Sequence, residues 1–139
     1  TYFTSTTVKD GFGTGANGDT IIQYVFSEVA GYSKLGSYTG NGSSNGTFVF
    51  TGFRPAWVMV KRIDTTNDWP ICDNKRNPSN LVDKALYADL SIAESTVNRY
   101  DFLSNGFKIR NNLNESNASG GTYIYLAFAE SPFKNARAR

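Results

Sequence analysis

The sequence predicts an all-β domain of antiparallel strands, specifically a two-sheet β-sandwich of the jelly-roll or a similar kind. Asn, Gly, Ser and Thr make up 53 of the 139 residues, a composition typical of a chain with many turns. Short runs of β-branched and aromatic residues alternate with polar, glycine-containing segments. Three of these runs are apolar without alternation, which is typical of strands covered on both faces, as between packed sheets.

The chain is expected to hold one domain preceded by an arm. Residues 1–19 are rich in Thr and Gly and have few apolar anchors, so we expect an extended N-terminal arm or linker there. Residues 20–139 are expected to form the single β-sandwich domain, a length that suits one hydrophobic core. Its first strand is predicted at residues 20–29, TIIQYVFSEV, where nearly continuous apolar character indicates a central strand.

The following strands are separated by turn-forming residues. Further strands are predicted at residues 33–39, 47–51, 56–63, 69–73 and 122–130. A loop of Asn, Gly and Ser joins the first two of these at residues 41–46. Trp57 lies in a strongly apolar strand and is expected in the core. Residues 81–93 fit a helical face or a strand, and we favour strand or irregular structure.

The clearest hairpin is predicted for residues 100–111. Asn105-Gly106 is typical of a two-residue type I′ turn, in which both central residues take a positive φ. This turn would pair Ser104 with Phe107. In that register one face of the hairpin carries the apolar side chains Tyr100, Phe102, Phe107 and Ile109.

Charge and residue types narrow the function. The net charge is +2 and no basic stripe interleaves with aromatic residues, so nucleic acid is not an expected partner. Histidine is absent, which removes the commonest general base and the commonest transition-metal ligand. No apolar run approaches the roughly 18–20 residues of a membrane span, so membrane insertion is not expected. We therefore expect no enzyme, no metal and no cofactor.

The candidate ligand site surrounds Trp69. Sugar sites commonly combine an exposed aromatic ring with amides, carboxylates and guanidinium groups that form hydrogen bonds. Asn67 and Asp68 directly precede Trp69, and Asp73 and Arg76 follow shortly after it. These five residues are the predicted ligand-binding set. In the alternative interpretation, Trp69 packs on a sheet edge and binds nothing.

Two carboxylates form a weaker candidate. Glu28 and Glu130 end strands of similar sequence, and a glycosidase needs two carboxyl groups about 5–10 Å apart. Strand-end capping, or a salt bridge to Lys34 or Lys134, is the favoured interpretation of these two residues.

Several runs in fixed order carry a family resemblance. They are residues 27–42 (SEVAGYSKLGSYTGNG), 48–62 (FVFTGFRPAWVMVKR), 76–78, 101–108 and 123–134. With them the chain resembles a family of β-rich domains of unassigned biochemistry in virion proteins of bacteriophages, mostly marine ones, often beside lectin-like domains. The resemblance covers roughly residues 20–139 and carries over no catalytic residues.

The resemblance implies a non-enzymatic module on the virion surface. We expect it to belong to a tail fibre, spike or receptor-binding protein that contacts the host. Expected partners are other virion proteins, further copies of the chain in a homo-oligomer such as a trimer, and a host surface glycan. Two alternatives stay open: a capsid decoration or head-fibre protein whose arm holds a neighbour, and a carbohydrate-binding module of a larger protein.

Overall fold

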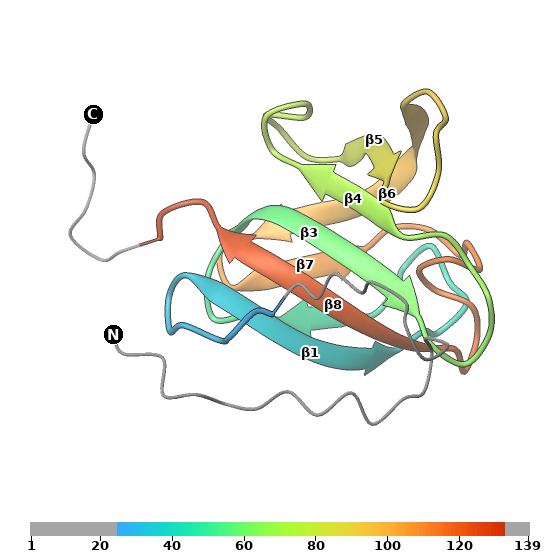
Figure 1. Ribbon diagram of the computed structural model, residues 1–139, viewed down its shortest axis with the longest axis horizontal. Helices are drawn as coiled ribbons and strands as arrows, with labels where there is room; N and C mark the ends of the chain where they lie inside the picture. The colour runs from blue at the N-terminus through green and yellow to red at the C-terminus, as the bar shows by residue number, and fades with distance from the viewer. Residues whose placement is uncertain (1–24, 133–139) are drawn as a thin grey trace, which may run out of the picture.

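The computed structural model describes residues 25–132, which contain eight β-strands and no helix (Figure 1). The strands are β1 (Ser33–Thr39), β2 (Phe48–Phe50), β3 (Pro55–Arg62), β4 (Pro70–Asp73), β5 (Val82–Tyr87), β6 (Ser95–Leu103), β7 (Gly106–Ile109) and β8 (Thr122–Ala129). Every pairing between them is antiparallel. The predicted all-β, antiparallel class is therefore confirmed.

The strands form one continuous sheet in the order β1-β8-β3-β4-β5-β6-β7-β2. Strand β5 pairs with β4 on one side and with β6 on the other, so the ladder has no break. The sheet curls into a nearly closed, barrel-like shape (Figure 1), and a hydrogen bond from Thr47, just before β2, to Thr39, the last residue of β1, links its two edges. The predicted two-sheet sandwich is not confirmed.

Side chains close the seam between the two edge strands. The hydroxyl of Tyr125, on β8, donates to the carbonyl oxygen of Phe50, on β2, at 3.3 Å. A Cβ atom on Gly36 would lie 2.9 Å from that hydroxyl, so a larger residue at this position would require the Tyr125 ring to shift. At the end of the seam, the Thr47 hydroxyl donates to the Thr39 carbonyl at 2.8 Å.

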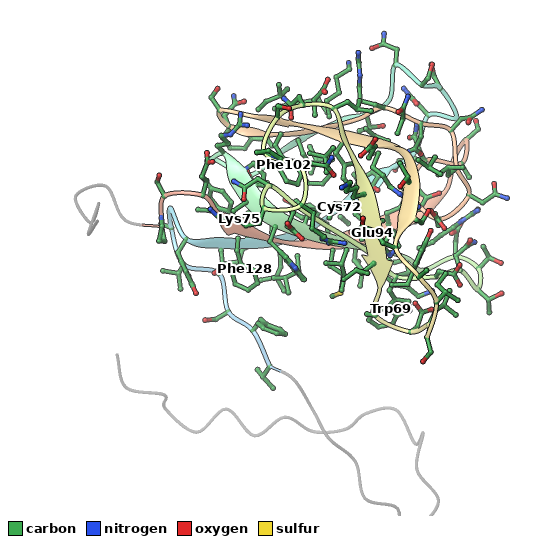
Figure 2. The ribbon with its side chains drawn as sticks, turned by 90° about the horizontal axis from the view of Figure 1, so that it is seen from above. Trp69, Cys72, Lys75, Glu94, Phe102 and Phe128 are labelled. Carbon is green, nitrogen blue, oxygen red and sulfur yellow. The ribbon has the colours of Figure 1, made fainter. Side chains whose placement is uncertain are left out.

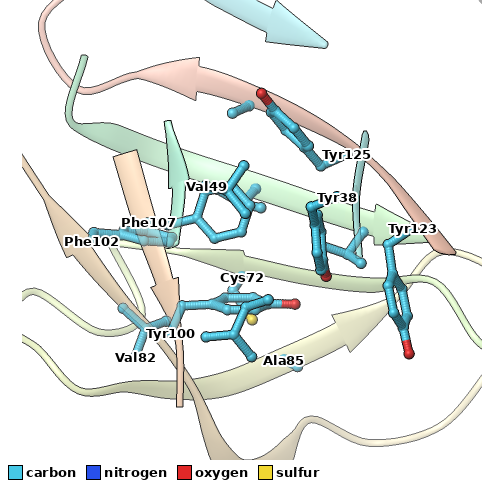
Figure 3. Packing of buried hydrophobic residues seen from close by; sticks show 14 of the residues in the cluster. Tyr38, Val49, Cys72, Val82, Ala85, Tyr100, Phe102, Phe107, Tyr123 and Tyr125 are labelled. Atoms are coloured by element: carbon cyan, nitrogen blue, oxygen red, sulfur yellow. The ribbon is translucent and has the colours of Figure 1, made fainter. Parts of the chain in front are cut away.

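The core fills the inside of the barrel and is rich in aromatic rings (Figure 3). The rings of Tyr38 and Tyr123 stack with centroids 5.0 Å apart. Phe107 makes edge contacts with Tyr38, Tyr100 and Tyr125 at 5.5–6.3 Å. Aromatic pairs in these geometries add about 0.5–1.5 kcal/mol beyond the burial of their area. The barrel interior is thus a packed core.

Most predicted strands are confirmed, and the ambiguous segment is resolved. Residues 81–93 contain strand β5, whose Val82 and Ala85 side chains are buried in the core. The strand prediction for residues 20–29 is wrong for its described part, because residues 25–29 are exposed and make only one isolated bridge, from Val29 to Ser33. The predicted arm and residues 20–24 lie outside the described residues.

The hairpin of β6 and β7 forms in a register two residues away from the predicted one. Leu103 pairs with Gly106, so the turn consists of Ser104 and Asn105. No non-glycine residue between 25 and 132 has a positive φ, so the type I′ prediction is wrong. A shift of two residues keeps every side chain on its face. The four apolar side chains predicted to share a face are all buried in the core: Tyr100, Phe102, Phe107 and Ile109.

Gly106 is required because strands β7 and β2 approach each other closely at this position. This requirement explains why the Asn105-Gly106 pair was wrongly interpreted as a type I′ turn. A Cβ atom at Gly106 would overlap the carbonyl oxygen of Val49 and lie 3.0 Å from the Phe48 ring, both on β2. The Asn105 carbonyl accepts the N–H of Thr51 at 3.0 Å and so ties the turn to the end of β2. The sequence pair Asn-Gly therefore marks a contact between strands, without the torsion that a type I′ turn requires.

Candidate functional site

The outer face of β1, β8 and β3 carries a groove of about 1110 Å³, which we call the outer groove. It exists because side chains alternate along each strand: one set fills the barrel and the other set points out. On β8 the odd-numbered residues from Tyr123 to Ala129 belong to the core. The outward set supplies most of the groove: Leu35, Trp57, Met59, Ile124, Leu126 and Phe128.

Strand register gives the outer groove two different ends. Across β8 and β3, three outward pairs follow one another: Phe128–Trp57, Leu126–Met59 and Ile124–Lys61. We call the region of the first pair the aromatic end and the region of the third pair the polar end. Phe128 and Trp69, both labelled in Figure 2, mark these two ends.

The aromatic end is a cluster of rings around Phe128. The centroid of the Phe128 ring lies 5.5 Å from the ring centroid of Trp57, 5.6 Å from that of Tyr32 and 6.2 Å from that of Phe26. Phe26 is half exposed, at 50%. The exposed apolar surface of these rings favours an apolar covering partner, because removing apolar surface from water is favourable by about 25 cal/mol per Å².

Trp57 is a correction to the sequence analysis, which placed it in the core. It lies at the aromatic end of the outer groove and is only partly buried. The inner face of β3 is filled by Val58 and Val60, which are fully buried. An apolar strand has no polar residue to show which face is inside, so the sequence pattern could not place Trp57.

The polar end assembles around Trp69, which is 38% exposed. The Lys61 ammonium lies 5.7 Å from the centre of the Trp69 ring and donates to the Asn67 carbonyl at 2.7 Å. The Asp89 carboxylate accepts the backbone N–H of Trp69 at 2.9 Å. An exposed ring, a cation and a carboxylate thus meet in one place. A cation over an indole face contributes about 0.5–1 kcal/mol at an exposed site.

Sequence reasoning found part of this end and missed the rest. Trp69 and Asn67 were in the predicted set, and half-buried Asp68 lies between them in the same turn. Lys61 and Asp89 were missed. They come close to Trp69 because β3 pairs with β4 and because the Ala88 N–H donates to the Trp69 carbonyl at 3.1 Å. Only knowledge of the pairing could have supplied these two residues.

Asp73 and Arg76, also in the predicted set, lie at the other end of β4. Strand β4 separates them from Trp69 by about 13 Å, at 3.3 Å per residue. The Arg76 Nε atom donates to Asp73 Oδ2 at 2.6 Å, and the backbone N–H groups of Lys75 and Arg76 donate to Asp73 Oδ1 at 2.8 Å. These two side chains stabilise the turn after β4 and do not join Trp69.

The same contacts set the protonation of Asp73. Partial burial acts to raise the pKa of its carboxyl group, but hydrogen bonds from Arg76 and Lys75 outweigh it and lower the pKa below the usual value. Asp73 is therefore a charged, structurally engaged group.

The two carboxylates considered as an acid pair each have a cationic partner. Glu28 forms the predicted salt bridge with Lys34, at 2.9 Å, and Glu130 lies 2.9 Å from Arg54. The hydrogen bond from Lys34, opposed by slight desolvation, lowers the pKa of Glu28. Lys134 lies outside the described residues. In residues 25–132 no group of three or more His, Cys, Asp or Glu side chains is arranged to hold a metal ion.

Two buried groups lie away from the outer groove. Cys72 is fully buried, and desolvation raises the pKa of its thiol to about 12. The Arg99 guanidinium, 1% exposed, pairs with Glu115 and donates to the Tyr87 hydroxyl at 2.6 Å. Both groups are part of the interior of the domain.

The described part of the chain contains no helix long and apolar enough to cross a membrane.

Comparison with known protein families places the chain. Residues 1–132 match the family described as a domain of unknown function, DUF7483. The chain belongs to this family. The DUF7483 match covers the predicted arm as well as all eight strands. No curated protein matches the chain, and no solved structure matches it. The family description names no activity, so the functional argument for this DUF7483 domain rests on its geometry.

Proposed function

We propose that this DUF7483 domain is a non-enzymatic adhesive module that binds a glycan at the polar end of the outer groove. The observation that carries the proposal is the exposed Trp69 ring flanked by Lys61 and Asp89. The resemblance of residues 27–42 and 48–62 to virion domains supports a place in a bacteriophage tail fibre, spike or receptor-binding protein. Other virion proteins and further copies of the chain are its proposed partners.

The chemistry of the polar end suits a sugar. A pyranose ring presents C–H groups on one face, and these pack against an indole, while its hydroxyl groups need donors and acceptors. Lys61 uses one of the three donors of its ammonium on the Asn67 carbonyl. The Asp89 carboxylate accepts the Trp69 N–H and has further acceptor sites.

The state of the carboxylates supports a binding role over a catalytic one. A glycosidase needs a carboxylic acid whose pKa is raised so that it can protonate the leaving group. Glu28 and Glu130 are both in ion pairs, and the pKa of Glu28 is lowered. This argument adds to the absence of histidine from the chain.

A glycan array with the full chain tests the proposal. We expect binding by the wild type and about a tenfold loss for Trp69→Ala, equivalent to about 1.4 kcal/mol. Phe50→Ala is the matched control, because Phe50 is an exposed aromatic residue on β2 outside the groove. Absence of any bound glycan, or equal binding by Trp69→Ala and wild type, would overturn the glycan assignment.

A structural role without a glycan is the second candidate, and the apolar character of the rest of the outer groove favours it. In this version the domain is a capsid decoration or head-fibre protein, and the groove packs against protein. Electron microscopy of labelled particles separates the two: label at the tail tip supports adhesion, and label on the capsid supports decoration. Light scattering on the isolated chain tests the proposed oligomer.

A further inference from the structure

We infer that the ligand of the outer groove is an acylated glycan, whose sugar lies at the polar end and whose alkyl chain runs along β8 toward the aromatic end. The inference rests on the proposed function for the sugar and adds the chemical class of the rest of the ligand. It assigns one occupant to both halves of the groove.

The middle of the outer groove is aliphatic. Leu126 on β8 lies between Leu35 on β1 and Met59 on β3, and all three line the groove. We call these three residues the apolar strip. Leu126 is 5% exposed, whereas its two neighbours are exposed to a larger extent. The aromatic end follows directly along β8, so the apolar surface is continuous from the strip to Phe128.

An alkyl chain suits the apolar strip better than a peptide does. The side chains of the strip carry no strong hydrogen-bond donor or acceptor. An extended peptide laid on them would turn backbone N–H and C=O groups toward a surface without partners, which is unfavourable. An alkyl chain has no such groups, and each methylene removed from water adds to affinity. The unbranched Met59 side chain can adapt its shape to such a chain.

The polar end offers both signs of charge to a head group. The next row across the sheet places Ser37 on β1 and Lys61 on β3 on either side of Ile124. Among the described residues, Lys61 and Asp89 are the charged ones that line the groove, and neither forms a salt bridge. A neutral head that both donates and accepts, as a sugar does, complements this pair better than an anion or a cation.

The length of the groove sets the length of the chain. From Ile124 to Phe128, β8 advances four residues, or about 13 Å at 3.3 Å per residue. An octyl chain is at most about 12 Å long, at about 1.5 Å per bond. With its sugar at Trp69, an octyl glycoside therefore keeps its whole chain inside the groove.

A series of alkyl β-D-glucosides tests the inference by isothermal titration calorimetry with the full chain. Methyl, hexyl and octyl β-D-glucoside share one head and are used below the concentrations at which they form micelles. We expect affinity to rise about two- to fourfold per methylene, the upper value corresponding to complete burial of the methylene. Octyl sulfate and octylammonium carry the same chain on a charged head and are expected to bind more weakly than octyl glucoside.

Met59→Asp places a charge in the apolar strip and is expected to abolish the dependence on chain length. Val97→Asp is the matched control, because Val97 is 41% exposed on β6 and does not line the groove. It is expected to leave the series unchanged. Met59→Gln is a milder second variant, expected to weaken octyl glucoside binding severalfold. Protection of the buried Cys72 thiol from a disulfide reagent checks that each variant remains folded.

Three outcomes would overturn the inference: affinity that does not change with chain length, equal effects of Met59→Asp and Val97→Asp, or tighter binding of octyl sulfate than of octyl glucoside. A domain that binds glycans on the array without any effect of chain length keeps the glycan site and loses the acyl chain. The reverse result, an effect of chain length with no glycan bound on the array, would overturn the proposed function and leave a groove for alkyl chains on other heads.

Discussion

Replacing Gly106 with alanine tests why this glycine sits next to the β6–β7 turn. Gly106 pairs with Phe50 on β2 and with Leu103 on β6. The added Cβ atom would overlap the Val49 carbonyl oxygen, a backbone atom that cannot rotate aside. The substitution must therefore push β2 away from β7.

The expected cost is about 2 kcal/mol of the free energy of unfolding. Overpacking typically costs about 1–3 kcal/mol, and a backbone obstacle places Gly106→Ala in the upper part of that range. The alanine also restricts the unfolded chain, which returns about 0.4–1 kcal/mol. The unfolding entropy is about 2.1 cal/mol/K per residue, taken over the 139 residues of the chain. A net cost of about 2 kcal/mol then corresponds to a fall in Tm of about 7 °C.

Thermal unfolding followed by circular dichroism measures this, with asparagine variants as controls. Gly120 has a φ of 73° and open space around its Cα, so Gly120→Asn is expected to be tolerated. If Gly106 served a positive φ, Gly106→Asn would be milder than Gly106→Ala. We expect the reverse, because asparagine is larger. A Tm unchanged by Gly106→Ala, or restored by asparagine, would refute the contact argument.

Two further predictions concern single ionisable groups. Because burial raises the pKa of Cys72 to about 12, its thiol is expected to stay unreactive toward a disulfide reagent at pH 8 until urea unfolds the chain; reaction at the rate of a free thiol would contradict this. Asp73→Asn is expected to destabilise the domain at pH 7. The lowered pKa of Asp73 means that its contribution exists above the unfolded-state pKa of about 3.9 and is lost as the pH falls through the folded-state pKa. Urea unfolding of the wild type and of Asp73→Asn, at pH 7 and at a pH below the folded-state pKa, measures this contribution. A difference in the free energy of unfolding between the two proteins that does not change with pH would count against the Arg76 contact.

The strands were predictable because their signals are local. Alternation and turn residues located β1, β4 and β8 to within a residue, and the faces of the β6–β7 hairpin were correct even in the wrong register. A period of two specifies faces, and a shift by two residues preserves them.

The outer groove was not predictable, because it depends on pairings between distant segments. Strand β8 lies between β1 and β3, and no local pattern encodes that order. Lys61 meets Trp69 only through the register of β3 and β4. Asn117 is a similar case. The sequence gives no sign that it differs from the other loop asparagines. In the structure it is fully buried, and its side-chain NH₂ group donates hydrogen bonds to the Asn41 side chain and to the Asn111 carbonyl.

The central place of β8 also sets the order in which the molecule can be assembled. Ser33 must find Phe128, and Ala129 must find Pro55, so both pairings wait for nearly the whole chain. Contacts this far apart in sequence slow folding and leave apolar strands exposed during synthesis. Chains halted on the ribosome before residue 122 should therefore be cut readily by a protease in β1 and β3. Resistance there before β8 emerges would show that another strand holds its place.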